Sequence, residues 1–150
     1  MNIQSTEKLK KSIASLHRRY YKQIYVVEYT NGNTVKRFSE ENDIPYLNLN
    51  IELSKLLLKE SIKRRPYKVS DYLNQLINAS SKDMICLDYY ELLFEPALRV
   101  NPFALFKSIS RNKMLLIAWR GNLNDHQFIH AEPGHPEYQK YSIADSVLIK

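Results

Sequence analysis

Runs of apolar and β-branched residues alternate along the chain with segments of helical spacing. QIYVVEY (23–29), DMICLDYY (83–90) and KMLLIAW (113–119) are nearly continuous apolar runs, as in strands that are buried on both faces. IPYLNLN (44–50) alternates apolar and polar positions, which is typical of a half-buried strand. HQFIHA (126–131) is shorter and predicts a fifth strand.

Helices are predicted between these strands, where apolar residues recur every three or four positions. The predicted helices span 5–20, 51–64, 69–80 and 101–111. We expect Pro66 to end the second helix and Ser70 to cap the third. Pro102 suits the first turn of the fourth helix. EPGHPEY (132–138) is predicted to be a loop, because two prolines and a glycine oppose regular structure.

Strands that alternate with helices predict an α/β fold of three layers, with a mostly parallel sheet of about five strands. Ligands of such folds bind beyond the carboxyl ends of the strands. Those ends carry EYTNGNT, DYYE and WRGN. We expect a basic amphipathic helix over 1–22 and one domain over 23–150.

The segment VEYTNGNT (27–34) can be compared with the phosphate-binding pattern G-x-x-x-x-G-K-[ST]. Gly32 and Thr34 match the pattern, whereas Asn33 replaces the lysine and Val27 replaces the first glycine. Glu28, at the entrance of the loop, would repel a triphosphate. The pattern therefore predicts a degenerate nucleotide-binding loop formed by Gly32, Asn33 and Thr34, with Thr34 as a cap of the helix that follows.

A β-hairpin is the alternative for 28–38. Asn-Gly between two β-rich runs is the strongest short hairpin signal, and it would place a tight turn at Asn31–Gly32. Local sequence leaves both interpretations open.

Asp88 ends the apolar run MICLD (84–88), about fifty residues after the loop. In magnesium–nucleotide proteins an aspartate in this place holds the metal. Tyr89 follows it where many hydrolases carry a glutamate, and Glu91 is a weaker substitute for that residue. An apolar strand that ends in aspartate is common, so a purely structural role for Asp88 stays open.

The net charge of +6 is concentrated at the N-terminus. Residues 1–22 hold six basic residues and one acidic residue, a net charge of +5, and the rest of the chain carries about +1. The nucleic-acid candidates in this segment are Lys8, Lys10, Lys11, Arg18 and Arg19. A solvated helix face is the alternative interpretation. A second, smaller basic cluster contains Lys63, Arg64, Arg65 and Lys68.

Other kinds of chemistry find little support. Apolar residues make up 44% of the chain, but no apolar run approaches the ~20 residues of a membrane span. The N-terminus lacks the apolar stretch of a secretory signal. With a single cysteine, Cys86, we expect a cytoplasmic protein without disulfides or a membrane partner. His126 and His130 would share a strand face, but no cysteine joins them, so we predict no metal site.

Four longer segments resemble a known family. They are PYLNLNIELSKLLL (45–58), LDYYELLFEPAL (87–98), SRNKMLLIAWRGNL (110–123) and AEPGHPEY (131–138). They resemble the BrxF family, small P-loop proteins of BREX phage-defence systems. The resemblance implies a P-loop NTPase-like fold, favours strand–loop–helix over the hairpin, and carries the Walker B aspartate over to Asp88.

The chain departs from the family pattern at Asn33, where the lysine is lost. From its position after the fourth strand, Arg120 is a candidate phosphate contact. We expect an accessory or assembly subunit with little or no ATP hydrolysis, and Mg-ATP is the one cofactor candidate. The alternatives are an active ATPase that uses Lys36 or a partner's arginine, and a nucleic-acid-binding module. Expected partners are other defence proteins, with nucleic acid or a second copy of the chain as alternatives.

Overall fold

The main sheet of the protein is parallel. The computed structural model describes residues 3–29, 31–124, 127–131, 134, 139–142 and 146–150. In these residues one five-stranded sheet has the order β2-β3-β4-β1-β8, with every neighbouring pair parallel. Its strands are β1 (Gln23–Val27), β2 (Tyr46–Asn48), β3 (Met84–Asp88), β4 (Met114–Trp119) and β8 (Val147–Ile149). The expected α/β fold with a mostly parallel sheet of about five strands is confirmed.

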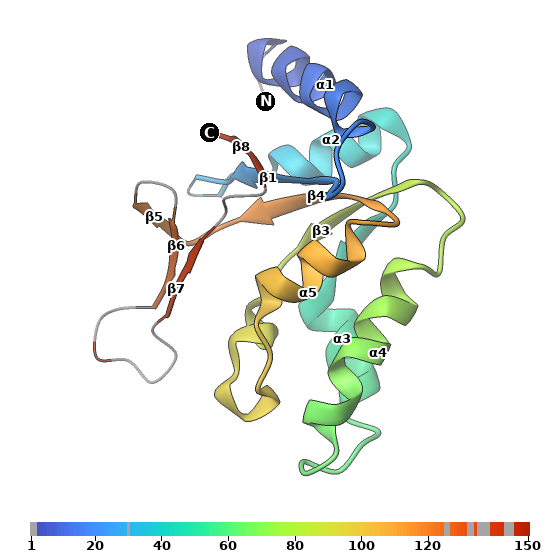
Figure 1. The fold of residues 1–150 in the computed structure, drawn as a ribbon, viewed down its shortest axis with the longest axis vertical. Coiled ribbons are helices and arrows are strands. Elements are labelled where there is room, and N and C mark those ends of the chain that lie inside the picture. The colour runs from blue at the N-terminus through green and yellow to red at the C-terminus, as the bar shows by residue number, and fades with distance from the viewer. Residues whose placement is uncertain (1–2, 30, 125–126, 132–133, 135–138, 143–145) are drawn as a thin grey trace.

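Helices cover both faces of this sheet. The helices of the described residues are α1 (Ile3–Leu16), α2 (Thr34–Asn42), α3 (Leu49–Leu57), α4 (Arg65–Ile77) and α5 (Pro102–Ile109), and the 3₁₀ turns are η1 (Glu91–Phe94) and η2 (Pro96–Leu98). Figure 1 shows α1 and α2 above the sheet and α3, α4 and α5 below it. The three layers predicted from the alternation of strands and helices are thus present.

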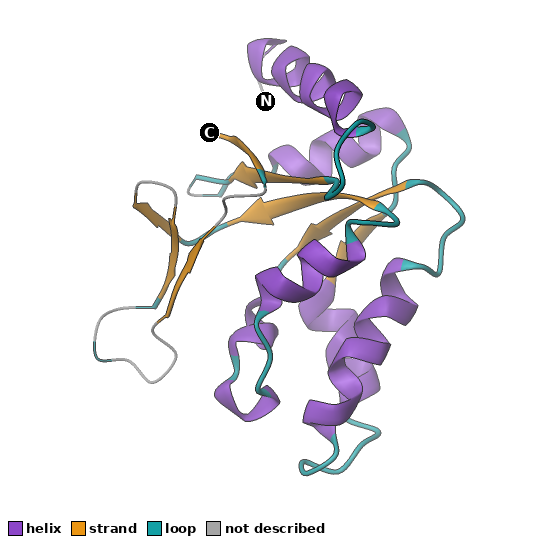
Figure 2. Ribbon diagram, in the orientation of Figure 1, coloured by secondary structure: helices purple, strands orange, loops and turns teal. Residues whose placement is uncertain are grey.

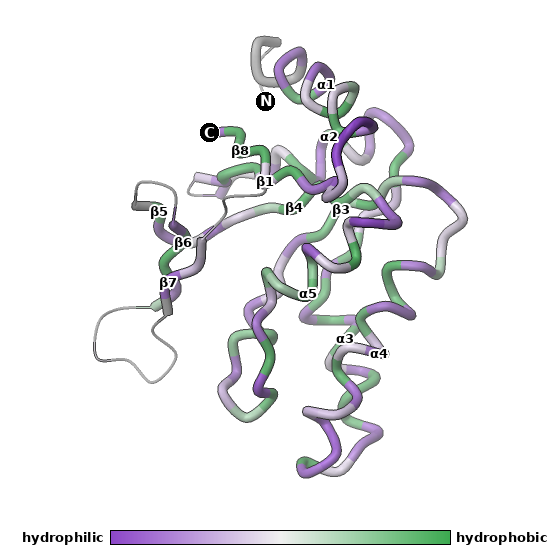
Figure 3. The backbone as a smooth tube through the Cα atoms, in the orientation of Figure 1, coloured by the Kyte–Doolittle hydropathy of each residue, from purple (hydrophilic) through white to green (hydrophobic). Residues whose placement is uncertain are grey.

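The central strands are buried on both faces, as their continuous apolar runs predict. On β1, Tyr25 belongs to the core shared with α3, α4 and α5, whereas Ile24 and Val26 belong to the core shared with α1 and α2. Figure 3 shows the hydrophobic stretches of β1 and β8 side by side in the sheet. Successive side chains of a strand point to opposite faces, so one strand supplies both cores.

The N-terminal helix is part of this packing. Leu9 and Leu16 are fully buried in the core of the α1–α2 layer, beside Ile24 and Val26 of β1. The amphipathic pattern predicted over 5–20 is therefore realised as a helix docked on the sheet, although the helix ends at Leu16. The basic residues of this helix, Lys8, Lys10 and Lys11, are exposed.

Two predicted helix boundaries are wrong. Helix α3 ends at Leu57, and α4 begins at Arg65, so Pro66 lies in the first turn of α4 and does not terminate the preceding helix. Ser70, predicted to be a cap, lies inside α4. Proline has no N–H to donate, and the first turn of a helix is where that loss costs least. The prediction for Pro102 is confirmed in the first turn of α5.

A second, antiparallel sheet follows the fourth strand. It consists of β5 (Asn122–Asn124), β6 (Gln127–His130) and β7 (Gln139–Ser142). The fifth strand predicted over 126–131 exists as β6, but it belongs to this sheet, and β8 takes the fifth place in the main sheet. Figure 2 shows the small sheet beyond the carboxyl end of β4. Apart from Gly134, the loop predicted over 132–138 lies outside the described residues.

Candidate functional site

The loop after β1 leads into a helix. Strand β1 ends at Val27, and α2 begins at Thr34, so the segment is strand–loop–helix and the hairpin interpretation is wrong. The Gly32 N–H donates to the Tyr29 carbonyl at 2.7 Å, and Asn31 has a φ of 58°. Asparagine tolerates this left-handed conformation better than most residues, which allows the tight turn.

The side chain of Glu28 holds the N-terminus of α2. Its Oε2 accepts from the Thr34 N–H at 2.9 Å, and its Oε1 accepts from the Val35 N–H at 3.1 Å. Only 6% of Glu28 is exposed. Helix N-termini attract anions because their first N–H groups lack partners and the helix dipole is positive there. The carboxylate of Glu28 therefore lies where a phosphate-binding loop would place a phosphate.

Neither Thr34 nor Asn33 caps the helix with its side chain. The N-cap residue is Asn33, and it makes no side-chain cap hydrogen bond, so the prediction that Thr34 is the cap is wrong. The reason is that Glu28, six residues earlier, already satisfies the N–H groups that a cap would take.

Gly32 is required for the approach of Glu28. A Cβ atom at this position would lie 2.8 Å from the Glu28 Oε2 and 2.9 Å from the Tyr29 carbonyl oxygen. Both separations are shorter than the contacts that a Cβ atom makes. The glycine that matches the phosphate-binding pattern thus makes room for an internal carboxylate.

Asp88 ends β3 fully buried, and both of its oxygens are saturated. Oδ1 accepts from the Arg120 Nε at 2.8 Å and from the Tyr89 N–H at 2.9 Å. Oδ2 accepts from the Arg120 Nη2 at 2.9 Å and from the Tyr46 hydroxyl at 2.6 Å. A carboxylate offers about four acceptor positions, so Asp88 keeps none for a magnesium-bound water.

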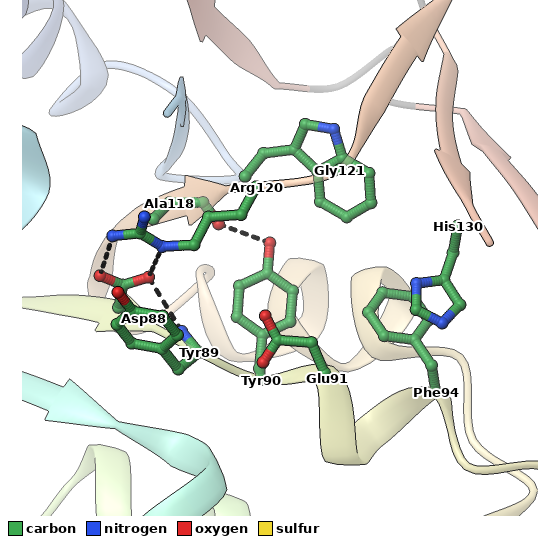
Figure 4. Close-up of a pocket in the computed structure, with 10 residues that line it drawn as sticks. Asp88, Tyr89, Tyr90, Glu91, Phe94, Ala118, Arg120, Gly121 and His130 are labelled. Atoms are coloured by element: carbon green, nitrogen blue, oxygen red, sulfur yellow. Dashed lines mark hydrogen bonds and ion pairs between the residues drawn. The ribbon is translucent and has the colours of Figure 1, made fainter. Parts of the chain in front are cut away.

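Arg120 joins this aspartate to the loop. Besides the bidentate contact of Arg120 with Asp88, the Arg120 Nη1 donates to the Gly32 carbonyl at 2.8 Å. Its guanidinium also lies over the Tyr89 ring, 4.3 Å from the centroid. Figure 4 shows the guanidinium turned toward Asp88. The structure thus brings together Gly32, Asp88 and Arg120, three residues that sequence reasoning placed at one site, but it does so through contacts within the protein.

The contacts with Asp88 stabilise the charged form of Arg120, and burial together with Asp88 stabilises the neutral form of Tyr46. The hydrogen bonds from Arg120 to Asp88 raise the pKa of the guanidinium further above its ordinary value. Burial, and then the hydrogen bond to Asp88, raise the pKa of Tyr46, so its hydroxyl stays a donor. The arrangement is an ion pair between Asp88 and Arg120, with the neutral Tyr46 hydroxyl as a further hydrogen-bond donor to Asp88.

A hollow of about 170 Å³ lies next to the pair. Aromatic side chains dominate its lining, which includes Tyr90, Phe94, Trp119 and His130. Figure 4 shows the His130 ring stacked on Phe94, with centroids 4.0 Å apart. The Tyr90 hydroxyl donates to the Ala118 carbonyl at 2.6 Å. Arg120 and two carboxylates, Asp88 and Glu91, also line the hollow, and the Arg120 guanidinium is paired with Asp88.

The other predicted site residues lie elsewhere. The basic candidates of the N-terminal segment, Lys8, Lys10, Lys11, Arg18 and Arg19, are all exposed. Lys36, the proposed replacement for the missing lysine, is exposed on α2. His126 lies outside the described residues. Among the residues that the structure describes, no three His, Cys, Asp or Glu side chains are grouped as a metal site would need.

Two contributors to the site were not recognised from the sequence. Glu28 was identified as a source of repulsion, but its bonds to α2 were not foreseen, and Tyr46 was not considered. A signal for Glu28 existed, since an acid before a helix that lacks a capping side chain can satisfy its N–H groups. For Tyr46 there was none, because its contact with Asp88 depends on the pairing of β2 with β3.

No family model, no curated protein and no solved structure matches the chain. The resemblance to BrxF therefore stays a prediction. None of the helices in the described part of the chain is long and apolar enough to span a bilayer.

Proposed function

We propose that the protein is an accessory or assembly subunit of a bacterial phage-defence system of the BREX kind, with little or no ATP hydrolysis. The observation that carries the nucleotide part of this proposal is the position of Glu28, whose carboxylate binds the two N–H groups at the start of α2. The protein supplies its own anion at the place where a P-loop binds phosphate.

Three features of the site oppose nucleotide chemistry together. A triphosphate would have to displace the buried Glu28 carboxylate or lie against it, and like charges repel strongly where water is excluded. Asn33 supplies no positive charge to offset that repulsion. The four acceptor positions of Asp88 are engaged, so a metal would first have to break its contacts with Arg120 or Tyr46.

The assignment to phage defence rests on the sequence segments that resemble BrxF, and the cytoplasmic location belongs to the same proposal. A subunit without nucleotide chemistry acts through its surfaces. Its partners would be other proteins of the defence system.

A defence assay tests this proposal in cells that carry the complete system. Deleting the chain should abolish protection against phage, and Asn33→Ala, which changes an exposed loop residue, should leave protection intact. The purified chain should show no ATP turnover above buffer. Unchanged protection after deletion would contradict the assignment to defence, and turnover by the pure chain would contradict the degenerate site.

Nucleic-acid binding is a second candidate, favoured by one observation. On α1 the apolar Leu9 and Leu16 are buried against the sheet, so Lys8, Lys10 and Lys11 are presented to solvent from a fixed helix. Such binding should weaken steeply as salt rises. Removing α1 would expose the core, so the test is Lys8→Ser/Lys10→Ser/Lys11→Ser in a duplex-DNA titration at low salt. Equal binding by this variant and the wild type would exclude α1 as the DNA-binding surface.

A further inference from the structure

An apolar groove of about 140 Å³ lies far from the loop of Glu28, between α3, the α3–α4 loop and the 3₁₀ turns. Leu57, Leu58, Ile62 and Arg65 line one side of it. Leu92, Leu98 and the exposed Glu95 line the other. Leu58 and Ile62 are 73% and 72% exposed. Figure 1 shows the α3–α4 loop at the foot of the molecule, near the turns that follow β3.

The exposed apolar side chains belong to the α3–α4 loop, which is held in place by hydrogen bonds. Arg65 donates from Nε to the carbonyls of Leu57 at 3.0 Å and Glu60 at 3.2 Å. The Glu60 carboxylate accepts from the Tyr72 hydroxyl at 2.7 Å and pairs with Arg64 at 3.5 Å. These bonds tie the loop to α3 and α4. The exposure of Leu58 and Ile62 is therefore fixed by hydrogen bonds, in a chain whose other leucines are mostly buried.

The same segment is strongly basic. Residues 55–68 contain six basic residues and one acidic residue, Glu60, a net charge of +5. Lys59, Lys63 and Arg64 are exposed beside Leu58 and Ile62. The positive charge lies on the α3–α4 side of the groove, and Glu95 is the one carboxylate among its lining residues. A ligand must therefore offer apolar groups to fill the groove and negative charge toward its α3–α4 side.

We propose that this groove binds an amphipathic segment of a partner protein, in which apolar side chains are flanked by acidic ones. The proposal rests on the proposed function, because an assembly subunit needs a contact surface of this kind. The concave shape favours a protein side chain over a lipid surface, which protruding apolar groups meet better. A nucleic acid backbone has no apolar group to fill the groove.

A labelled synthetic peptide of 18 residues, with leucines at helical spacing and glutamates between them, is the probe. Fluorescence anisotropy should show saturable binding that Leu58→Ser/Ile62→Ser weakens at least tenfold, on the order expected for two anchor side chains. Both residues are exposed, so the variant should keep the fold. A peptide with lysines in place of the glutamates should not bind.

A matched pair of charge variants distinguishes binding at the groove from non-specific electrostatic attraction to a basic protein. Lys59→Glu/Lys63→Glu should weaken binding of the acidic peptide about tenfold, whereas Lys8→Glu/Lys10→Glu, the same charge change on α1, should leave it unchanged. The proposal is overturned if the acidic peptide does not bind, or if the α1 variant weakens binding equally. It is also overturned if vesicles of phosphatidylserine bind through Leu58 and Ile62 while the peptide does not.

Titrating the same protein with Mg-ATP keeps this inference separate from the proposed function. Mg-ATP binding would contradict the degenerate site whatever the peptide does. Absence of both peptide and Mg-ATP binding would overturn the groove proposal alone.

Discussion

Glu28 is the residue on which the account of the site depends most. A carboxylate that accepts from two N–H groups at a helix start acts as a cap and interacts with the helix dipole at the same time. The sequence showed that an acid stood in the loop and that it opposed a triphosphate. It could not show that the chain turns tightly enough at Asn31 and Gly32 to bring that acid onto its own helix.

Replacing this carboxylate should destabilise the fold. Glu28→Gln keeps the size of the side chain but loses its charge and one acceptor, so we expect the free energy of unfolding to fall by about 1–2 kcal/mol. Urea unfolding measures it. Glu41→Gln is the matched control, since Glu41 is exposed in the last turn of the same helix, where the dipole gives an acid no support. Equal midpoints for the two variants would contradict the role of Glu28.

The Asp88–Arg120 pair should be costly to break. Arg120→Ala leaves a fully buried carboxylate without its cation, so we expect a loss of about 3 kcal/mol or more. Arg120→Lys should recover only part, because an ammonium cannot reproduce the two parallel bonds to Asp88 and the bond to Gly32. The control is Arg37→Ala, at an exposed position of α2. If Arg120→Ala costs no more than this control, the pair contributes nothing to stability.

Among the secondary-structure elements, the long apolar runs and two of the shorter strands, β2 and β6, were predictable, whereas the short strands β5, β7 and β8 were not. The runs of apolar residues in β1, β3 and β4 are long enough to predict buried strands. β8 has three residues, and it is a strand only because β1 offers an open edge to pair with. The start of α4 was not predicted correctly. A proline in the interior of a helix interrupts it, whereas a proline in the first turn is compatible with a helix that begins there, and local sequence does not distinguish the two cases.

The helices α2 and α5 differ in how they are capped, which gives a direct comparison. The Asn101 side chain accepts from the Phe103 and Ala104 N–H groups at 3.0 and 3.2 Å, whereas Asn33 accepts from none in its helix. Asn101→Ala should therefore cost about 1 kcal/mol of unfolding free energy, and Asn33→Ala about 0.5 kcal/mol or less. Thermal unfolding of both variants checks this. A larger loss for Asn33→Ala would mean that Glu28 does not replace the cap.

At the scale of the whole molecule, the core on the α1–α2 side of the sheet buries Cys86 completely. Burial raises the pKa of the Cys86 thiol to about 12. Since the thiol ionises more readily in the unfolded chain, its contribution to stability is complete below the ordinary value of 9.0 and is lost as pH rises through about 12.

The buried thiol should react only after unfolding. At pH 8.5 a disulfide reagent should leave native Cys86 unmodified and label it fully in guanidinium chloride, because the nucleophile is the exposed thiolate. Rapid labelling of the native protein would contradict the burial of the β3 face that packs against α1 and α2.

The resemblance predicted a P-loop-like arrangement, and the layer pattern predicted a mostly parallel sheet. The fold brings a loop, an aspartate and an arginine together at the carboxyl ends of the inner strands. In this molecule these groups bind one another, which supports the proposal of a degenerate nucleotide site. These contacts depend on distances within the folded chain, which no motif records.

The most direct test is the melting temperature of the wild-type protein with and without millimolar Mg-ATP. A ligand that binds only the folded state, at a hundred times its dissociation constant, adds about 2.7 kcal/mol of stability, which is several degrees for a domain of this size. We expect no shift in the melting temperature, because Glu28 and the Asp88–Arg120 pair already fill the site. A saturable rise of about 5 °C or more would show that the protein opens this site to nucleotide, and would contradict this expectation.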